Sequence, residues 1–437
     1  MFFKTFSERV LGIIGRDFLV SIISFIVTTF LANKLGIEVF GLWIGIISLL
    51  AILDLVFRLK IDRLIIFYSK ENAYNKNLYK KISILSLYGV IVCGIVMIVL
   101  SSFIMEFFNL NNTIILLLIY SIFFVSVFGN IIFYIFLAEA KYTSYNFCIL
   151  GQSITLLSSI LMFFYFFDSS IQWALTAQFL SWVFVFIYFT VSRYRGSGNL
   201  NFDNNRAFNV TSYDILIKGS YIYSASALKV ISDQIPKLFV MNFLGIIPLG
   251  HLGLAQIIIG LINRVPQAIN TVLYPMLVSS SADELKKTVR IIRMLFLIFI
   301  PIIISLEFLM PFFVNVFYGD KFNTTALYVQ ILLPFVYIGI PGIILSSYFA
   351  SKGKFNILLT TNFVAIFFSL LSLGIIYTIS KDHAAIIAIC TSFIGLSISS
   401  IYFIKNSVLL SDFLPSKSDV INLYFFIKRL RAALKKS

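Results

Sequence analysis

The strongest constraint on this chain is a succession of apolar runs, each about as long as a lipid bilayer is thick. A helix needs about 20 mainly apolar residues to cross the hydrocarbon core of a bilayer. Such runs follow one another from end to end, separated by short polar breaks, and they predict an all-α polytopic membrane protein with twelve transmembrane helices. The predicted spans lie near residues 10–32, 39–57, 82–105, 114–137, 146–167, 172–192, 214–242, 249–278, 291–317, 325–350, 355–379 and 384–404.

Composition supports the membrane class and narrows the function. Only 12% of the residues are charged, about half the fraction of a typical soluble domain. The three cysteines, Cys93, Cys148 and Cys390, fall inside apolar runs, which argues against a disulfide framework or a zinc site. No Gly-rich phosphate loop, metal-spaced cluster or nucleophile elbow occurs in the sequence, so we expect neither an enzyme nor a bound cofactor.

The positions of the basic residues predict the orientation in the membrane. When the twelve spans are threaded in order, 26 of the 34 Lys and Arg residues fall on one side, and only Lys34, Lys321 and Lys381 fall on the other. Cytoplasmic loops are enriched in Lys and Arg. If one span were wrongly split, every loop after it would be assigned to the opposite side of the membrane and the asymmetry would be lost. The asymmetry therefore supports twelve spans with both termini cytoplasmic. The net charge of +15 then indicates contact with anionic membrane lipids and not with nucleic acid.

A short motif that occurs twice predicts an internal repeat. The pattern Leu-Gly-Ile-x-x-x-Gly covers Leu35–Gly41 and again Leu244–Gly250, 209 residues later, and the same offset carries Ile82 at the third span onto Ile291 at the ninth. Six helices per repeat is an even number, so both halves start on the same side as parallel repeats. We expect two six-helix lobes around a central cavity. These are residues 1–197 and 214–405, joined by a cytoplasmic linker at 198–213.

Two further features distinguish the later part of the chain. All nine prolines follow residue 235, which predicts bent helices in the second lobe, either as static packing kinks or as parts of a gate. The tail, residues 406–437, alternates apolar with basic residues. It is predicted to form an amphipathic helix on the cytoplasmic leaflet, with partner docking as the alternative.

Charged residues inside the predicted spans indicate a binding pathway, because ionisable groups at membrane depth are costly. In the seventh span Lys229, Asp233 and Lys237 follow at i, i+4 and i+8, along one helical face. Arg264 is a second deep cation, in the eighth span. A cavity of this sign attracts phosphate or pyrophosphate. The alternative is an internal Lys229–Asp233 ion pair without substrate contact.

Other charges allow more than one reading. Arg16 and Asp17 are adjacent, so we expect them to point to different faces of the first span. Arg16 and Lys218 are candidates for substrate contact at a cytoplasmic entrance, or they extend to lipid headgroups. The candidates for binding a coupling proton or sodium ion are Asp17, Asp54, Asp233 and Glu307. Each carboxylate could instead be hydrogen-bonded near an interface.

Several stretches resemble one transporter family. Leu35–Trp43, followed by Leu53-Asp54-Leu55, resembles the opening of Wzx-type O-antigen flippases, which are polysaccharide exporters of the multidrug/oligosaccharidyl-lipid/polysaccharide superfamily with a MATE-like fold. The similarity continues through Tyr274-Pro275, through Pro311 with Val316–Gly319 and Phe322, and through Ser346–Lys354. One departure concerns the end of the second span, where Val56-Phe57-Arg58 replaces a glycine common in the family.

The resemblance implies a cargo and a location. It implies that an undecaprenyl-pyrophosphate-linked oligosaccharide is flipped across the bacterial inner membrane by alternating access, driven by an ion gradient. A polymerase and a chain-length regulator of the same pathway are the implied protein partners. A multidrug or organic-ion exporter of the same fold is the alternative, although it would favour an acidic cavity. A polysaccharide polymerase would need a large outer loop, and every predicted outer loop is short.

Overall fold

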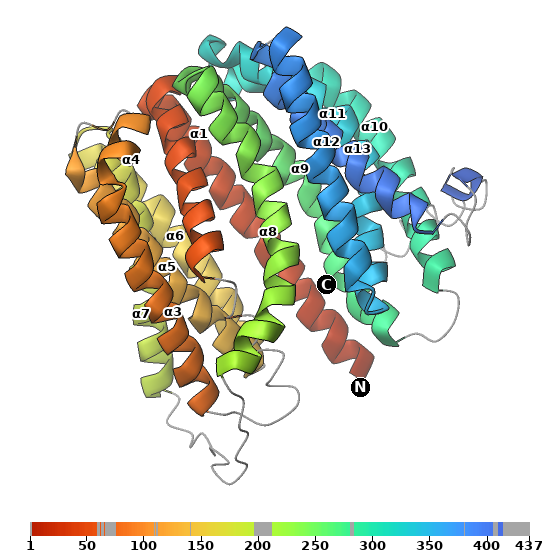
Figure 1. Cartoon of the computed structure of the whole chain (residues 1–437), viewed down its shortest axis with the longest axis horizontal. Coiled ribbons are helices and arrows are strands. Elements are labelled where there is room, and N and C mark those ends of the chain that lie inside the picture. Colours follow the sequence, from red (N-terminus) through yellow and green to blue (C-terminus); the bar gives the residue numbers. More distant parts are fainter. Residues whose placement is uncertain are drawn as a thin grey trace, which may run out of the picture. The chain divides into compact units, whose positions relative to one another are not determined.

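The computed structural model of the chain is almost entirely helical (Figure 1). It describes residues 2–58, 62, 65, 76–108, 110, 112–139, 141–195, 212–279, 284–379, 381–404 and 410–413. The α-helices are α1 (Phe2–Arg58), α3 (Lys76–Val99), α4 (Ser101–Phe107), α5 (Thr113–Ala138), α6 (Tyr142–Phe166), α7 (Ile171–Arg195), α8 (Ser212–Phe243), α9 (Ile246–Ser279), α10 (Glu284–Tyr318), α11 (Asn323–Ser351), α12 (Phe355–Ile379) and α13 (Lys381–Tyr402). Two short 3-10 helices are η2 (Asp320–Phe322) and η3 (Leu410–Phe413).

These helices confirm the predicted all-α polytopic class. Helix α1 covers the first two predicted spans, α3 and α4 together cover the third, and α5 to α13 cover the other nine in order. Within the described residues, nine helices are long and apolar enough to cross a membrane. The membrane orientation of the termini stays a prediction.

The chain forms two compact units, Met1–Gly250 and His251–Ser437. In the first unit α6 packs against α7, α5 packs against α7, and α1 contacts both α6 and α8. In the second unit α13 packs against α11 and α12, while α10 packs against α11. Most of the predicted linker and most of the predicted tail lie outside the described residues, and the predicted division into lobes stays a prediction.

The repeated glycine motif forms two equivalent turns in the first unit. Gly36 has φ 73° and Gly245 has φ 98°, backbone values that residues with a Cβ adopt only at a cost. At Gly36 the backbone leaves the helical conformation, which divides α1 into its two spans. Figure 1 shows α1 turning back on itself between its two spans. The first glycine of each motif therefore makes the turn.

The last glycine of each motif packs against the turn of the other motif. A Cβ on Gly41 would overlap the carbonyl oxygen of Ile246, and a Cβ on Gly250 would lie 2.6 Å from the carbonyl oxygen of Ile37. The same 209-residue offset relates Gly41 to Gly250 and Ile37 to Ile246. The contact is therefore reciprocal, because the same position of each motif packs against the same position of the other.

A Cβ at either glycine should open this contact. We expect Gly41→Ala and Gly250→Ala each to destabilise the detergent-purified protein by about 1–3 kcal/mol, the usual range for overpacking, seen as a lower Tm. Gly374→Ala in α12 is the control, because no atom lies within 4 Å of its added Cβ and alanine favours a helix. A Tm unchanged in both turn variants would contradict the packing described above.

Candidate functional site

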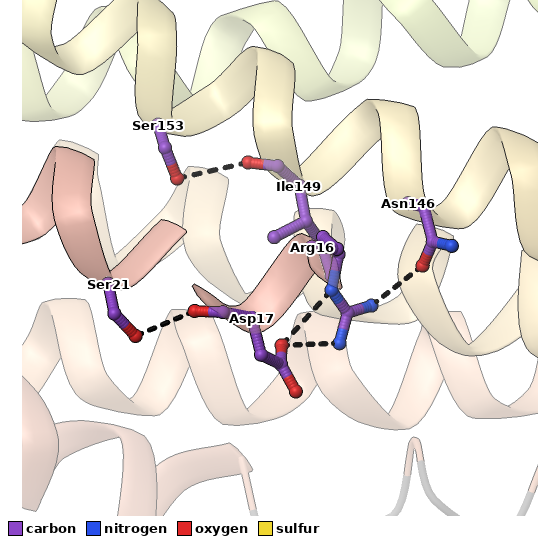
Figure 2. A network of polar contacts seen from close by, with 6 residues as sticks. All are labelled: Arg16, Asp17, Ser21, Asn146, Ile149 and Ser153. Carbon is purple, nitrogen blue, oxygen red and sulfur yellow. Dashed lines mark hydrogen bonds and ion pairs between the residues drawn. The ribbon is translucent and has the colours of Figure 1, made fainter. Parts of the chain in front are cut away.

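A buried arginine near the start of the first unit forms the most complete polar site in the described residues. Arg16 lies on α1 where that helix packs against α6, and its side chain is only 7% exposed. Its Nη2 and Nε atoms donate to Asp17 Oδ1, at 2.6 Å and 3.1 Å. Its Nη1 donates to Asn146 Oδ1 on α6, at 3.1 Å (Figure 2). The guanidinium carbon lies 4.8 Å from the ring centroid of Tyr145.

The expectation that Arg16 and Asp17 point to different faces of α1 is wrong. The two side chains bend toward each other and form an ion pair, which Figure 2 shows directly. Burial removes water from the guanidinium, so Arg16 needs a protein partner. Its flexible side chain can bend back to the neighbouring carboxylate. Asp17 remains 41% exposed, so the pair is buried at the arginine and open at the carboxylate.

Asn146 and Tyr145 are functional candidates that sequence reasoning missed. They lie near the start of α6, and Asn146 is 130 residues from Arg16 in the chain. A single asparagine at the start of an apolar run gives no signal that distinguishes it from a boundary residue. Only the packing of α1 on α6 shows that its amide oxygen faces the guanidinium.

This arrangement can bind an oxyanion. A guanidinium presents a planar set of donors that suits phosphate, pyrophosphate or carboxylate. Tyr145 and Asn146 hold Arg16 from the α6 side, and the internal anion Asp17 occupies two of its donors on the exposed side. An incoming anion would therefore have to compete with Asp17.

Asp54, an ion-coupling candidate, lies in a separate charged cluster at the end of α1. Arg58 Nη1 is 2.8 Å from Asp54 Oδ1, and Arg58 Nε is 3.7 Å from Asp62 Oδ2. Arg58 is 5% exposed and Asp62 is fully buried. Arg58 is thus a buried partner of two carboxylates, although it directly follows the second predicted span at 39–57. Helix α1 continues through Val56-Phe57-Arg58 despite the missing family glycine.

The cations predicted in the seventh and eighth spans are not shown to share a site. On α8, Lys237 is half-buried and its Nζ lies 3.4 Å from Gln234 Oε1, while Asp233 is exposed. The side chains of Lys218 and Lys229 lie outside the described residues. Arg264 is exposed on α9, in the second unit. Their roles in binding substrate therefore stay predictions.

Two polar groups of the second unit lie between its helices. His251 Nδ1 is 2.9 Å from Thr325 Oγ1, which joins α9 to α11. Glu307, another ion-coupling candidate, lies on α10, and its backbone carbonyl accepts a hydrogen bond from Gln330 of α11. Among the described residues no group of three or more His, Cys, Asp or Glu side chains is placed to hold a metal ion.

Comparison with known proteins gives the fold and the family context. Residues 30–327, more than half of the chain, match the family model described as polysaccharide biosynthesis protein. No curated protein matches the chain in sequence.

Solved transporters share the fold over nearly the whole chain. An inward-facing multidrug resistance MATE family transporter of the MOP superfamily superposes with a TM-score of 0.66 at 17% identity, over 93% of this chain and 96% of its own. A mutant of the Vibrio cholerae MATE transporter VcmN gives 0.65 at 14%, over 92% and 98%. The lipid II flippase MurJ, in an inward closed conformation, gives 0.64 at 14%, over 97% and 91%. The MATE-like fold predicted from the sequence is thus confirmed.

The arginine site makes a direct prediction for anion binding. Asp17→Asn removes the competing charge but keeps a hydrogen-bond acceptor, so we expect pyrophosphate to bind about tenfold more tightly. The reason is that hydrogen bonds between charged groups contribute about 1.5–3 kcal/mol. Arg16→Ala should abolish this binding, and Arg16→Lys should retain only part of it because lysine lacks the planar fork. Titration calorimetry on the purified protein measures all three, and equal affinity in wild type and Arg16→Ala would exclude the site.

Proposed function

The chain belongs to the polysaccharide biosynthesis protein family, and on that premise we propose that it flips an undecaprenyl-pyrophosphate-linked oligosaccharide from the cytoplasmic to the periplasmic leaflet. The protein is a multi-pass membrane flippase of the multidrug/oligosaccharidyl-lipid/polysaccharide type. Its location in this proposal is the bacterial inner membrane. Its product supplies O-antigen, as part of lipopolysaccharide biosynthesis, or a related surface polysaccharide.

The observation that carries the anionic cargo is the buried Arg16 site. Arg16 is kept away from water and is held by Asn146 and Tyr145, and Asp17 balances its charge within the protein. Asp17 is nevertheless open to its surroundings, so a pyrophosphate can replace it at the guanidinium. Lys237, Arg264, Lys218 and Lys229 are further candidates for contact with the anionic headgroup.

The transport cycle we propose is alternating access, in which the protein opens to one side of the membrane at a time. In this proposal the two turns that pack reciprocally, Gly41 on Ile246 and Gly250 on Ile37, separate when the protein opens toward their side of the membrane. An ion gradient supplies the driving force, so the protein would work as an antiporter for protons or sodium ions.

A multidrug exporter is the alternative, because multidrug MATE transporters share the fold at comparable TM-scores. Such a protein binds organic cations and would need exposed carboxylates free of competing positive charge. In the described residues Asp17 and Asp54 each pair with an arginine, which disfavours organic cations at those positions. The family match to polysaccharide biosynthesis supports the saccharide cargo.

Deleting the gene tests the proposed function. We expect lipid-linked repeat units to accumulate on the cytoplasmic leaflet and surface polymer to be lost, while resistance to organic cations stays unchanged. Labelling of exposed glycans on intact cells and extraction of lipid-linked intermediates measure the two effects. Normal surface polymer in a clean deletion would exclude the flippase proposal, and drug sensitivity without glycan loss would favour the exporter.

A further inference from the structure

A proline in α10 leaves one backbone carbonyl without its helical partner. Pro311 has no N–H, so the carbonyl of Glu307, four residues earlier, receives no intrahelical hydrogen bond at this point. Gln330 of α11 supplies the missing donor, with its Nε2 atom 2.8 Å from the Glu307 carbonyl oxygen. An amide side chain from one helix therefore holds the bend of another.

The side chain of Glu307 lies at the same place. It shares the face of α10 that carries the buried residues Ile303, Met310 and Val314. Its Oε2 atom is buried and has no hydrogen-bond partner among the described residues. Glu307 thus has its backbone carbonyl bound by Gln330 and one carboxyl oxygen, Oε2, buried beside the same bend, while the residue as a whole is half-buried.

The described residues around Glu307 offer its carboxyl no ion-pair partner. Glu307 is the only charged residue between Arg293 and Asp320, and α11 contains no Asp, Glu, Lys, Arg or His. The titratable groups on the elements packed against α10 are Tyr328, Tyr337 and Tyr348 on α11, Asp320 and Lys321 on η2, and Asp412 on η3. None of these is a hydrogen-bond partner of the buried Oε2 atom of Glu307 in the described part of the chain. A carboxyl oxygen that is buried without a hydrogen-bond donor favours the neutral form of the group.

We propose that Glu307 is a proton-binding site whose ionisation competes for the amide of Gln330. When the carboxyl O–H bond breaks and the proton leaves to water, the carboxylate needs a donor. The Gln330 amide already reaches the carbonyl of this residue. Its transfer to the carboxylate leaves the carbonyl beside Pro311 unpaired, which changes the bend of α10. Proton binding is thereby coupled to helix geometry.

This inference deepens the proposed function, because it names the proton as the coupling ion. The use of the proton to drive flipping rests on the proposed function, whereas proton binding by Glu307 does not. Helix α11 offers a matched comparison. Ser397 of α13 donates through its Oγ atom to the carbonyl of Ile338, at 2.6 Å, three residues before Pro341. Pro341 removes the helical partner of the Tyr337 carbonyl and not of Ile338, so Ser397 adds a contact near a proline and does not replace a lost bond. Neither Ser397 nor Ile338 is titratable, so this contact is a control that involves no proton.

A mutant cycle tests the hydrogen bond at the bend. Gln330→Ala should lower Tm because the Glu307 carbonyl loses its donor. Adding Pro311→Ala restores the backbone N–H, so the double variant should recover most of the lost Tm. Ser397→Ala should lower Tm too, but Pro311→Ala should not rescue it. An equal loss of Tm for Gln330→Ala with and without Pro311→Ala would overturn the assignment.

Proton binding is measured without any cargo. Infrared difference spectra of the protein in lipid nanodiscs, recorded between low and high pH, should show the carbonyl band of a protonated carboxyl that Glu307→Gln removes. Glu284→Gln is the control and should leave the band in place, because Glu284 Oε2 is 2.7 Å from Lys352 Nζ. Ser397→Ala should also leave the band. A band that persists in Glu307→Gln would overturn the proposal. An intact band in a protein that fails to flip glycolipid would instead reject the proposed function alone.

Discussion

The hydrogen-bonding requirement of the backbone in an apolar environment determines much of this structure. Where no water is available, each carbonyl and N–H group needs a partner within the protein, which favours helices. The second unit contains prolines that break this pattern, and at Pro311 a side chain from a neighbouring helix supplies the missing donor, because Gln330 reaches the Glu307 carbonyl. That bend therefore depends on a contact between two helices.

Buried charged side chains also need partners within the protein. Arg16 and Arg58 are almost fully buried, and each has carboxylate partners close by in the chain. A buried charge without a partner would be strongly destabilising, so pairing is a condition for keeping these residues. The pairs differ in one respect that matters for function. The Arg16 pair is open on the side of Asp17, whereas Asp62 is fully buried beside Arg58.

The sequence predicted the helical class and the repeat because both depend on local pattern. Span length follows from apolar runs, and the motif that contains Gly36 and Gly245 marks a turn that only glycine makes easily. The candidate site was predicted only in part. Adjacency alone suggested that Arg16 and Asp17 diverge, but side-chain flexibility and burial bring them together. Asn146 could not be predicted, because its role depends on which helices pack together.

The reciprocal glycine contact also has an evolutionary consequence. If the two repeats arose by duplication, an ancestor with one repeat per chain could have made the same contact between two copies across a true two-fold axis. In such a dimer any substitution at the packing glycine would change both halves of the contact at once. Joining the repeats in one chain makes Gly41 and Gly250 independent positions. Selection can then adjust one half of the contact without changing the other.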